Sequence, residues 1–321
     1  AGYGPDRRRD AALMHELVMG VLRQRLALLA VVGRFVKRPL HDLEDPVREV
    51  VLCMAYQALF LDRIPPHARV STAVEAARRV SGDGAAGFVN AVGRALEAAR
   101  SSEDLLTGLP EGVRWSLPDW ALKRIRPLLG ADLGLEPLAR LAAHAPVTYR
   151  VNRVHLSRQK ALQELDRAGV RASPTRWAND GIVFGEDAGL SLQEFVPGRL
   201  FPQDEASQLV GQLLDPRAGE RVLDLCAGVG GKTSQILALA PTASVTAVDL
   251  IPDKLTRCLE LCRAQGLPIP LIRSEDGRRL PRDMHGTFHA VLLDAPCTGL
   301  GTLVRRPEVR YLRTDEDVVR A

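Results

Sequence analysis

Apolar residues in the first 130 positions recur at intervals of three and four, the spacing of a helix with one buried face. Asp45 before Pro46 is a helix start signal, and Gly82, two residues after Val80, is a stop signal. We therefore expect a helical bundle over residues 1–130. The stripes that indicate it are Met14, Leu17, Val21 and Leu22; Val47, Val50, Val51, Met54 and Ala58; and Val70, Val74, Ala77 and Val80.

Residues 131–201 change pattern and predict a small α+β domain. Such domains often bind single-stranded RNA, although this one lacks the paired aromatic residues that stack on bases. We expect Trp177 and Phe184 to fill its core instead. The predicted elements are a helix from Glu136 to Ala143, a strand from Val147 to Val151, a helix from Ser157 to Ala168 and a strand from Gly181 to Phe184.

Residues 202–321 alternate strand and helix, which predicts a doubly wound parallel sheet. The switch point of such a sheet lies at the carboxyl end of its first strand, and we expect the functional site there. The predicted elements are strands at Arg221 to Cys226, Ser244 to Asp249, Ile269 to Arg273 and Ala290 to Asp294, with helices at Gly231 to Ala240 and Pro252 to Gln265.

The sequence LDLCAGVGGKT, from Leu223 to Thr233, places a glycine turn between the first strand and its helix. Free backbone N–H groups in such a turn bind polar or anionic ligands. A dinucleotide site fails because Thr233 stands where its third glycine should be. A phosphate-binding P-loop matches at Gly231, Lys232 and Thr233 but has Cys226 in place of its first glycine. An S-adenosylmethionine site fits the turn and would use Asp249 for the ribose. The glycine pattern favours this third site and leaves the P-loop open.

Several motifs in order resemble a known family, the ribosomal RNA cytosine-5 methyltransferases. These enzymes carry LDLCAAPGGKT followed by DAPCSG or DAPCTG, and this chain has LDLCAGVGGKT, Asp249, Asp276 and DAPCTG at Asp294 to Gly299. The segments ELVMGVLR, AYQALFLDRIPPHARVSTAVEAA, GFVNAV and PQDEASQL are similar to the methyltransferase B (Sun) branch, which has a NusB-like helical domain. The resemblance covers nearly the whole chain.

The resemblance implies three domains: an all-α NusB-like domain over 1–130 that contacts RNA or protein, a small α+β linker or RNA-binding domain over 131–201, and a Rossmann-like methyltransferase domain over 202–321. It implies S-adenosylmethionine as cofactor, with Asp276 at the adenine amino group. The expected cofactor-binding residues are Cys226, Ala227, Gly228, Val229, Gly230, Gly231, Lys232, Asp249, Asp276 and Asp294. Gly228 and Val229 replace the family's usual Ala-Pro, which should loosen the turn.

The resemblance also implies the chemistry. A thiolate that adds to carbon 6 of cytosine makes carbon 5 nucleophilic enough to take a methyl group. In this family the cysteine matching Cys297 assists product release, with Asp294 beside the base, whereas the attacking thiolate comes from a later T-C-S or T-C-T motif. No such motif follows Cys297 in this sequence. We therefore expect the methyltransferase domain to be incomplete, with the attacking cysteine beyond Ala321.

Other polar residues near the turn are expected to be structural. Asp224, inside the first strand, should accept hydrogen bonds from N–H groups of the glycine turn, and Cys226 should be an inert buried thiol. Lys232 should pair with an acid or reach the cofactor carboxylate. Cys258 and Cys262, four residues apart on a helix, lack the two further ligands that a zinc site needs, so no metal is expected.

Composition agrees with a folded cytoplasmic protein and adds little more. The chain has 321 residues, 46% of them hydrophobic, and a net charge of +4. It shows neither a membrane-spanning run nor a signal-peptide core, and its five cysteines lack the paired spacing of a disulfide framework.

Arginines flank the DAPCTG motif and could bind RNA phosphates, or form a solvated face paired with Glu308, Asp315 and Glu316. They are Arg278, Arg279 and Arg282 before it, and Arg305, Arg306, Arg310 and Arg313 after it, of which Arg305, Arg306 and Arg310 are the RNA-binding candidates.

The predicted function is S-adenosylmethionine-dependent methylation of a cytosine carbon 5 in small-subunit ribosomal RNA, through a covalent cysteine–base intermediate. The expected partner is unassembled or partly assembled ribosomal RNA, with no membrane or metal, and the protein is expected to be a monomer. Two alternatives stay open: a P-loop nucleotide hydrolase, which would bind ATP with magnesium, and a non-catalytic RNA-binding protein with a degenerate methyltransferase fold.

Overall fold

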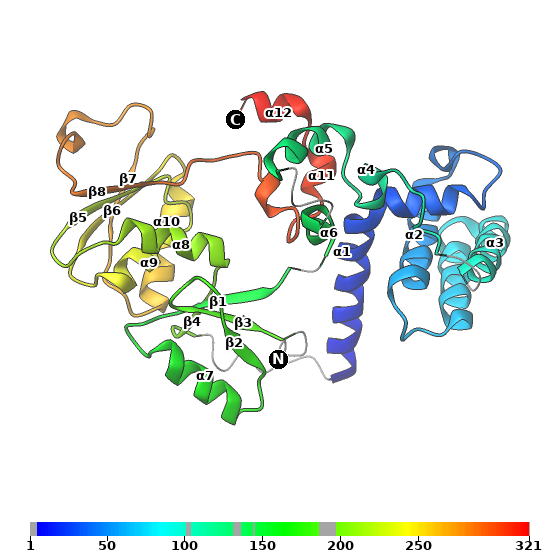
Figure 1. Cartoon of the computed structure of the whole chain (residues 1–321), viewed down its shortest axis with the longest axis horizontal. Helices are drawn as coiled ribbons and strands as arrows, with labels where there is room; N and C mark the ends of the chain where they lie inside the picture. The colour runs from blue at the N-terminus through cyan, green and yellow to red at the C-terminus, as the bar shows by residue number, and fades with distance from the viewer. Residues whose placement is uncertain (1–4, 101–103, 131–135, 144, 186–196, 321) are drawn as a thin grey trace. The chain divides into compact units, whose positions relative to one another are not determined.

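The computed structural model describes residues 5–100, 104–130, 136–143, 145–185 and 197–320, with side chains described from residue 10 onward except at residue 136. The chain divides into two compact units, one comprising Ala1–Ala145 with Cys297–Ala321 and the other Pro146–Pro296. The first unit is helical, and the second contains both sheets (Figure 1). The expected ranges 1–130, 131–201 and 202–321 stay predictions.

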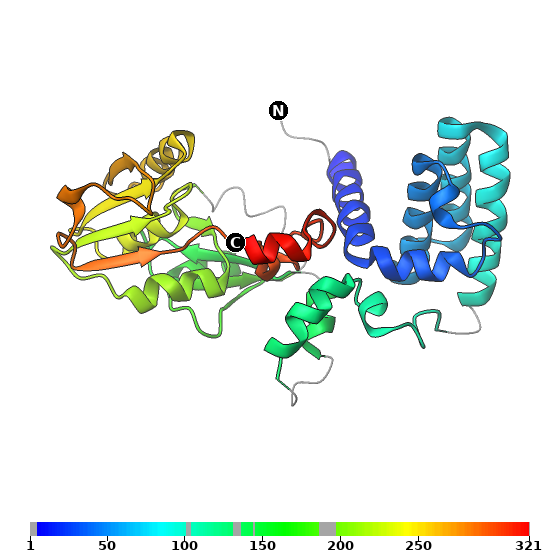
Figure 2. The same cartoon turned by 90° about the horizontal axis from the view of Figure 1, so that it is seen from above.

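Three long helices build most of the helical unit: α1 (Pro5–Gly33), α2 (Asp45–Phe60) and α3 (Pro66–Arg100), with the short 3-10 helix η1 (Leu40–Asp42) between the first two. The expected start at Asp45 is confirmed. Gly82 has φ +80° and interrupts α3, so the expected stop is confirmed and the two halves of α3 lie side by side (Figure 2). The core of these helices includes Val21, Leu28, Val51, Met54, Ala77, Val89 and Leu96.

A second cluster in the same unit joins segments that are distant in the sequence. Leu117 and Leu138 pack with Leu303 and Val309, so the segment after Cys297 is part of the helical unit. The helices around this cluster are α4 (Glu111–Arg114), α5 (Asp119–Ile125), η2 (Arg126–Leu128), α6 (Glu136–Ala142), η7 (Leu300–Thr302), α11 (Val309–Leu312) and α12 (Asp315–Arg320).

The other unit begins with a four-stranded antiparallel sheet in the order β2-β3-β1-β4. Phe184 is 5% exposed and packs in its core, as predicted, but the expectation for Trp177 is wrong. Trp177 is 60% exposed because it lies in the turn between β2 and β3, where Glu205 binds the turn's N–H groups. The elements are β1 (Val147–Val151), α7 (Arg158–Arg167), β2 (Ala172–Pro174), β3 (Gly181–Phe184) and β4 (Leu200–Pro202).

The second sheet is parallel, with the order β7-β6-β5-β8. Its first strand, β5, therefore lies between β6 and β8, and the expected switch point at the carboxyl end of β5 is confirmed. β7 begins at Leu271, two residues later than expected. The elements are α8 (Glu205–Leu214), β5 (Arg221–Leu225), α9 (Gly231–Leu239), β6 (Ser244–Asp249), α10 (Pro252–Ala264), β7 (Leu271–Ser274), η6 (Arg282–Met284) and β8 (Ala290–Leu293).

Different structures cover the two faces of the parallel sheet. On one face, Val222 and Val245 pack against Ile236 of α9 and Leu255 of α10. On the other face, Leu223 and Val248 pack against the segment that contains Met284 and Phe288. A helical domain, an antiparallel α+β domain and a Rossmann-like parallel sheet are thus all present, which confirms the predicted fold class.

Candidate active site

The glycine turn between β5 and α9 has an unusual backbone. Cys226, Gly228 and Gly230 have φ values of +76°, +57° and +89°, in the region that residues with side chains rarely adopt. A Cβ added at Gly230 would lie 2.5 Å from Cys258 Sγ, so only glycine allows α9 to begin this close to α10. A Cβ added at Gly228 would meet no atom within 4 Å. The turn is therefore packed against the protein at Gly230 and faces open space at Gly228.

Hydrogen bonds fasten the turn to the end of β6. The N–H groups of Cys226 and Ala227 both donate to the carbonyl of Val248, at 2.9 and 2.8 Å. Asp249, which ends β6, accepts the N–H of Gly228 at Oδ2, 2.9 Å away. The first N–H groups of α9 have no intrahelical acceptors, as at any helix start. These N–H groups and the open backbone at Gly228 are suited to a polar ligand.

Asp249 is 8% exposed and uses both carboxylate oxygens within the protein. In addition to the Gly228 bond, Oδ1 accepts the N–H of Ile251 at 2.9 Å and lies 3.8 Å from Lys254 Nζ. A carboxylate has about four lone-pair sites, so two neutral donors leave capacity for ligand hydroxyls. The structure therefore places Asp249 beside the glycine turn, with acceptor capacity left for the hydroxyl groups of a ligand.

Lys232, the second residue of α9, forms the expected pair with an acid. Its Nζ lies 2.5 Å from Asp294 Oδ2 and donates to Ser207 Oγ at 3.1 Å. Asp294 follows the end of β8, so the pair links the start of α9 with the carboxyl end of a neighbouring strand. Ser207 of α8 was not predicted, because nothing in the sequence pairs it with a lysine 25 residues later.

Asp224 corrects one expectation. Its Oδ2 accepts the hydroxyl of Thr233 at 2.6 Å, and Asp249, not Asp224, binds the glycine turn. Asp224 is 1% exposed, and its Oδ1 has no hydrogen-bond partner among the described residues. Burial raises the pKa of this carboxyl to about 6. The expectation failed because the Asp224 side chain faces Thr233 of α9 and not the backbone of the glycine turn.

None of the three cysteines of the parallel-sheet unit, Cys226, Cys258 and Cys262, is exposed. Burial and nearby acids, first Asp249, raise the pKa of Cys226, which fits the expected inert role although its side chain is only partly buried. Cys258 and Cys262 are fully buried and pack with Leu255 and Ile236 in the core. Within the described residues, no three His, Cys, Asp or Glu side chains gather as a metal-ligand set.

Asp276 lies in the turn after β7 and acts there as a turn former. It accepts the backbone N–H of Arg278 at 3.0 Å and pairs with the Arg278 guanidinium at 2.7 Å. This side-chain hydrogen bond, together with the backbone bond, lowers the pKa of Asp276 to about 2. The carboxylate is partly exposed and negatively charged at neutral pH. Its contact with adenine stays a prediction.

Cys297 is exposed and belongs to the helical unit, whereas Asp294 belongs to the parallel-sheet unit. Two of the three RNA-binding candidates that follow it, Arg305 and Arg306, are exposed, and Arg306 pairs with Glu308 at 3.0 Å. Their contact with RNA stays a prediction.

The RNA-binding assignment of Arg310 is wrong, because its side chain is 0% exposed. Its Nη1 donates to the carbonyls of Arg23 at 2.8 Å and Trp115 at 3.2 Å, and Nη2 donates to Leu141. Burial lowers the pKa of Arg310 to about 10, which still leaves it charged at neutral pH. Its position in α11, next to the buried Val309, brings it into the helical core.

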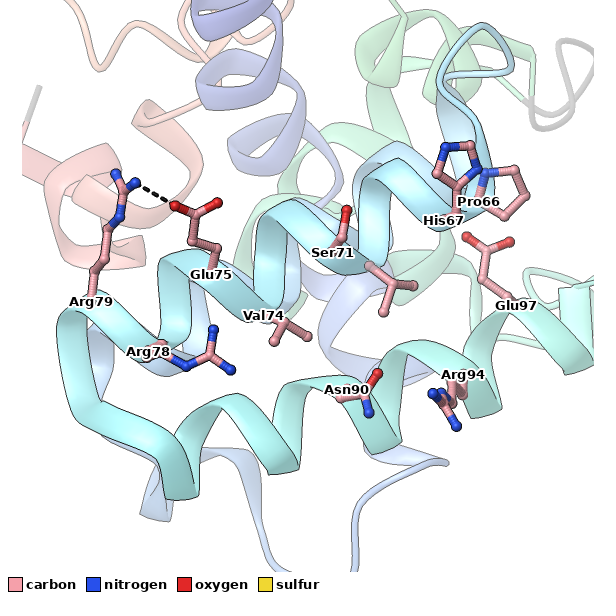
Figure 3. Close-up of a pocket in the computed structure, with 11 residues that line it drawn as sticks. Pro66, His67, Ser71, Val74, Glu75, Arg78, Arg79, Asn90, Arg94 and Glu97 are labelled. Carbon is pink, nitrogen blue, oxygen red and sulfur yellow. Dashed lines mark hydrogen bonds and ion pairs between the residues drawn. The ribbon is translucent and has the colours of Figure 1, made fainter.

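A groove in the helical unit lies between the two halves of α3 (Figure 3). It encloses about 1000 Å³, with Val70 and Val74 along its length and Arg78 and Arg94 among the charged groups beside it. Arg79 pairs with Glu75 at its rim. The glycine turn is not part of its lining.

In the part of the chain that is described, no helix is long and apolar enough to span a membrane.

Comparisons with known proteins identify the family. Residues 211–321 match the family described as 16S rRNA methyltransferase RsmB/F, residues 3–97 match the NusB family, and residues 117–189 match the ferredoxin-like domain of RsmF/B-like methyltransferases. The ribosomal RNA small subunit methyltransferase B of Pseudomonas syringae pv. tomato is 36% identical over 315 residues, covering 97% of this chain and 69% of its own length. This chain belongs to the RsmB/F family of 16S rRNA methyltransferases.

Further relatives agree. The methyltransferase B of Escherichia coli O6:K15:H31 is 33% identical over 314 residues, which cover 97% of this chain and 72% of that protein. The crystal structure of PH0851 matches with a TM-score of 0.74 and 21% identity, covering 96% of this chain and 71% of that one. NSun6 from Pyrococcus horikoshii, solved with SFG, matches with a TM-score of 0.53 and 19% identity, over 63% of this chain and 76% of that one. At these identities the two structures support the fold alone. The expected enzyme class, an RNA methyltransferase, is confirmed by the family.

Proposed function

We propose that this RsmB/F-family protein transfers a methyl group from S-adenosylmethionine to carbon 5 of a cytosine in small-subunit ribosomal RNA. The observation that carries the proposal is the hydrogen bond from the Gly228 N–H to Asp249, which places this acid beside the glycine turn at the switch point of the parallel sheet. A donor that presents ribose hydroxyls and an amino-acid group matches an acid and a set of free N–H groups placed side by side.

The residues around the turn fit this donor. Gly228 leaves open space beside the backbone, and Asp249 retains acceptor capacity for the ribose. Leu250 and Ile251, which follow Asp249, are 63% and 46% exposed and offer apolar surface to an aromatic ring. Asp276 would accept a hydrogen bond from the adenine amino group. The full donor-binding set in this proposal is residues 226–232 together with Asp249, Asp276 and Asp294.

The catalytic proposal assigns separate roles to the polar residues. S-adenosylmethionine supplies an electrophilic methyl group on its sulfonium. Asp294 hydrogen-bonds the cytosine ring, and Lys232 orients the Asp294 carboxylate through their 2.5 Å contact.

Covalent catalysis needs two thiol roles. A thiolate adds to carbon 6 of the cytosine, carbon 5 takes the methyl group, and loss of the carbon-5 proton then breaks the carbon 6–sulfur bond and returns the thiolate. We assign this product-release step to Cys297 as its assisting group. The attacking thiolate is assigned to the family's later T-C-S or T-C-T motif, which these 321 residues do not contain.

The decisive experiment is trapping of the adduct in a full-length enzyme that carries both cysteine motifs. Cys297→Ala should methylate the base and then stay attached to the RNA, giving a denaturant-resistant band of higher mass. The same variant with the later cysteine also replaced should give no band. Loss of methyl transfer in Cys297→Ala without any adduct would contradict the release role.

Two further experiments address the rivals. ATP with magnesium should not compete with S-adenosylmethionine, and competition would support the P-loop hydrolase. Absence of tritiated-methyl transfer to any ribosomal RNA by the full-length protein would support the non-catalytic RNA-binding protein. The proposal further includes action on unassembled or partly assembled small-subunit RNA by a cytoplasmic monomer that needs no metal.

A further inference from the structure

Arg150 is a buried cation that crosses from one sheet domain to the other. It lies in β1 of the antiparallel sheet and is 1% exposed. Its Nη1 donates to the carbonyl of Gly231 at 3.2 Å, and its Nη2 donates to Ser234 Oγ at 2.9 Å. Gly231 and Ser234 both belong to the first turn of α9, directly after the glycine turn. Arg150 therefore contacts the helix start that carries the candidate donor site.

Burying the charged Arg150 guanidinium at this position is electrostatically unfavourable, which argues for more than a space-filling role. In the described part of the chain, no carboxylate lies within ion-pair distance of Arg150, although the charge of Asp180 favours the guanidinium from further away, and Nε has no hydrogen-bond partner. Its charge lies beside the positive end of the α9 dipole. Burial lowers the pKa of Arg150 to about 10, so the group is still charged at neutral pH. The Phe201 ring, 5.4 Å from the guanidinium carbon, provides partial compensation.

The other polar side chains at the start of α9 bind groups outside this helix. Lys232 contacts Ser207 and Asp294, and Thr233 donates to Asp224. Gln235 donates to the carbonyl of Gln208 at 2.6 Å and accepts from Gln203 at 3.1 Å. The Gly231 carbonyl and Ser234 complete this turn, and Arg150 is their contact from the antiparallel sheet.

We infer that Arg150 is a positioning residue for the methyl-donor site. By holding Gly231 and Ser234, it fixes where α9 begins and therefore where the free N–H groups and the Lys232 ammonium point. This inference rests on the proposed binding of S-adenosylmethionine at the glycine turn. It assigns to the α+β domain a role in donor binding that is separate from any contact with RNA.

The test compares two variants of Arg150 with a matched control in the same domain. Arg150→Met keeps the length of the side chain but removes the charge and both hydrogen bonds, and it should raise the donor Kd and the donor KM about tenfold. Arg150→Lys retains the charge and one donor and should recover part of the loss. The control is Arg158→Met, because Arg158 donates to the Ala178 carbonyl at 2.8 Å within the α+β domain and does not contact α9. Calorimetry measures the Kd, and steady-state assays with the full-length enzyme give KM for donor and RNA separately.

A second measurement tests the coupling directly. Ser234→Ala should raise the donor Kd about threefold, and adding it to Arg150→Met should raise the Kd by clearly less than threefold. Both changes remove the Arg150–Ser234 contact, whereas only Ser234→Ala removes the Ser234 Oγ bond to the Gly231 carbonyl. Additive effects would mean that Arg150 does not act through Ser234. If Arg150→Met fails to fold, Arg150→Lys and Ser234→Ala still decide the question.

Three outcomes would overturn the inference: an unchanged donor Kd in Arg150→Met, an equal loss in Arg158→Met, or an increase in KM for RNA alone. Asp249→Ala is measured in parallel. If Asp249→Ala binds the donor normally, the proposed donor site itself is wrong, whatever Arg150 does. If Asp249→Ala weakens binding and the Arg150 and Ser234 variants do not, only the positioning role is lost.

Discussion

The glycine turn and the arginine-rich segment after Cys297 were both expected to bind ligands, and the structure builds them in opposite ways. At the turn, Gly228 faces open space and Asp249 keeps unused acceptor capacity. In the segment, Arg310 donates its hydrogen bonds to backbone carbonyls of the helical core. Charge density in a sequence therefore does not identify a binding surface. The hydrogen-bonding capacity that a polar group still has after folding identifies a binding surface more reliably.

The strongest test of this contrast replaces Arg310. Arg310→Met should leave several buried carbonyls without a donor and destabilise the helical unit by about 3 to 5 kcal/mol. Arg306→Met, four residues earlier and exposed, should change stability by less than about 0.5 kcal/mol. Chemical denaturation of both variants measures the difference. A stable Arg310→Met that binds RNA poorly would restore the original assignment.

Asp224 gives the second test, through pH. Its native pKa of about 6 exceeds its unfolded value near 3.8, so the folded state holds this proton longer than the unfolded state. Stability from this group is therefore greatest below about pH 4 and falls as pH rises to about 6, by about 3 kcal/mol in total. Asp224→Asn lacks the titration, so its stability relative to the wild type should rise across that window. Chemical denaturation at several pH values measures this difference. The same free-energy difference between the two proteins at pH 4 and at pH 7 would contradict the raised pKa of Asp224.

Asp249 tests the side of the contrast that retains capacity. Asp249→Ala removes the ribose acceptor and the bond to Gly228, and it should weaken S-adenosylmethionine binding by about 1.5 to 3 kcal/mol. Asp253→Ala is the matched control, because this exposed acid lies four residues further along the chain in the first turn of α10. Calorimetry should separate the two. Normal affinity in folded Asp249→Ala would remove this acid from the site.

The smallest expected effect concerns Arg305 and Arg306. If they contact phosphates, the double alanine variant should weaken RNA binding by about 1 kcal/mol or less at moderate salt and reduce the dependence of affinity on salt. Arg217→Ala, an exposed arginine in the parallel-sheet unit, serves as control. Binding curves at several salt concentrations would show the effect. An unchanged salt dependence would mean that the segment is a solvated face.

Local signals in the sequence predicted most of the fold. Asp45-Pro46 marks a helix start, Gly82 marks a break, and the glycine turn lies at the carboxyl end of β5, as expected. The placement of Asp249 at the end of β6 followed from strand length alone.

Pairings across long separations could not be predicted in this way. Arg150 and Gly231 are 81 residues apart, and Lys232 and Asp294 are 62 apart. No periodicity links such residues, because the contacts depend on how whole elements pack. The burial of Arg310 was missed for the same reason, because one of its acceptors is 287 residues away. The exposure of Trp177 has a local cause, its place in the turn between β2 and β3.

Gly82 has a consequence for the assembly of the helical unit. A continuous helix of the 35 residues in α3 would be about 52 Å long, and the single residue Gly82, with φ +80° and ψ −170°, folds it back on itself. An alanine at this position would disfavour the reversal by about 1 to 3 kcal/mol, because φ +80° with ψ −170° is essentially restricted to glycine, and it would favour the straight form. The second half of α3 would then leave Met54 and Val70 of its own chain, which it now contacts at Gly93. The equivalent surface of another copy could accept it, so one glycine separates a self-contained helical unit from a domain-swapped pair.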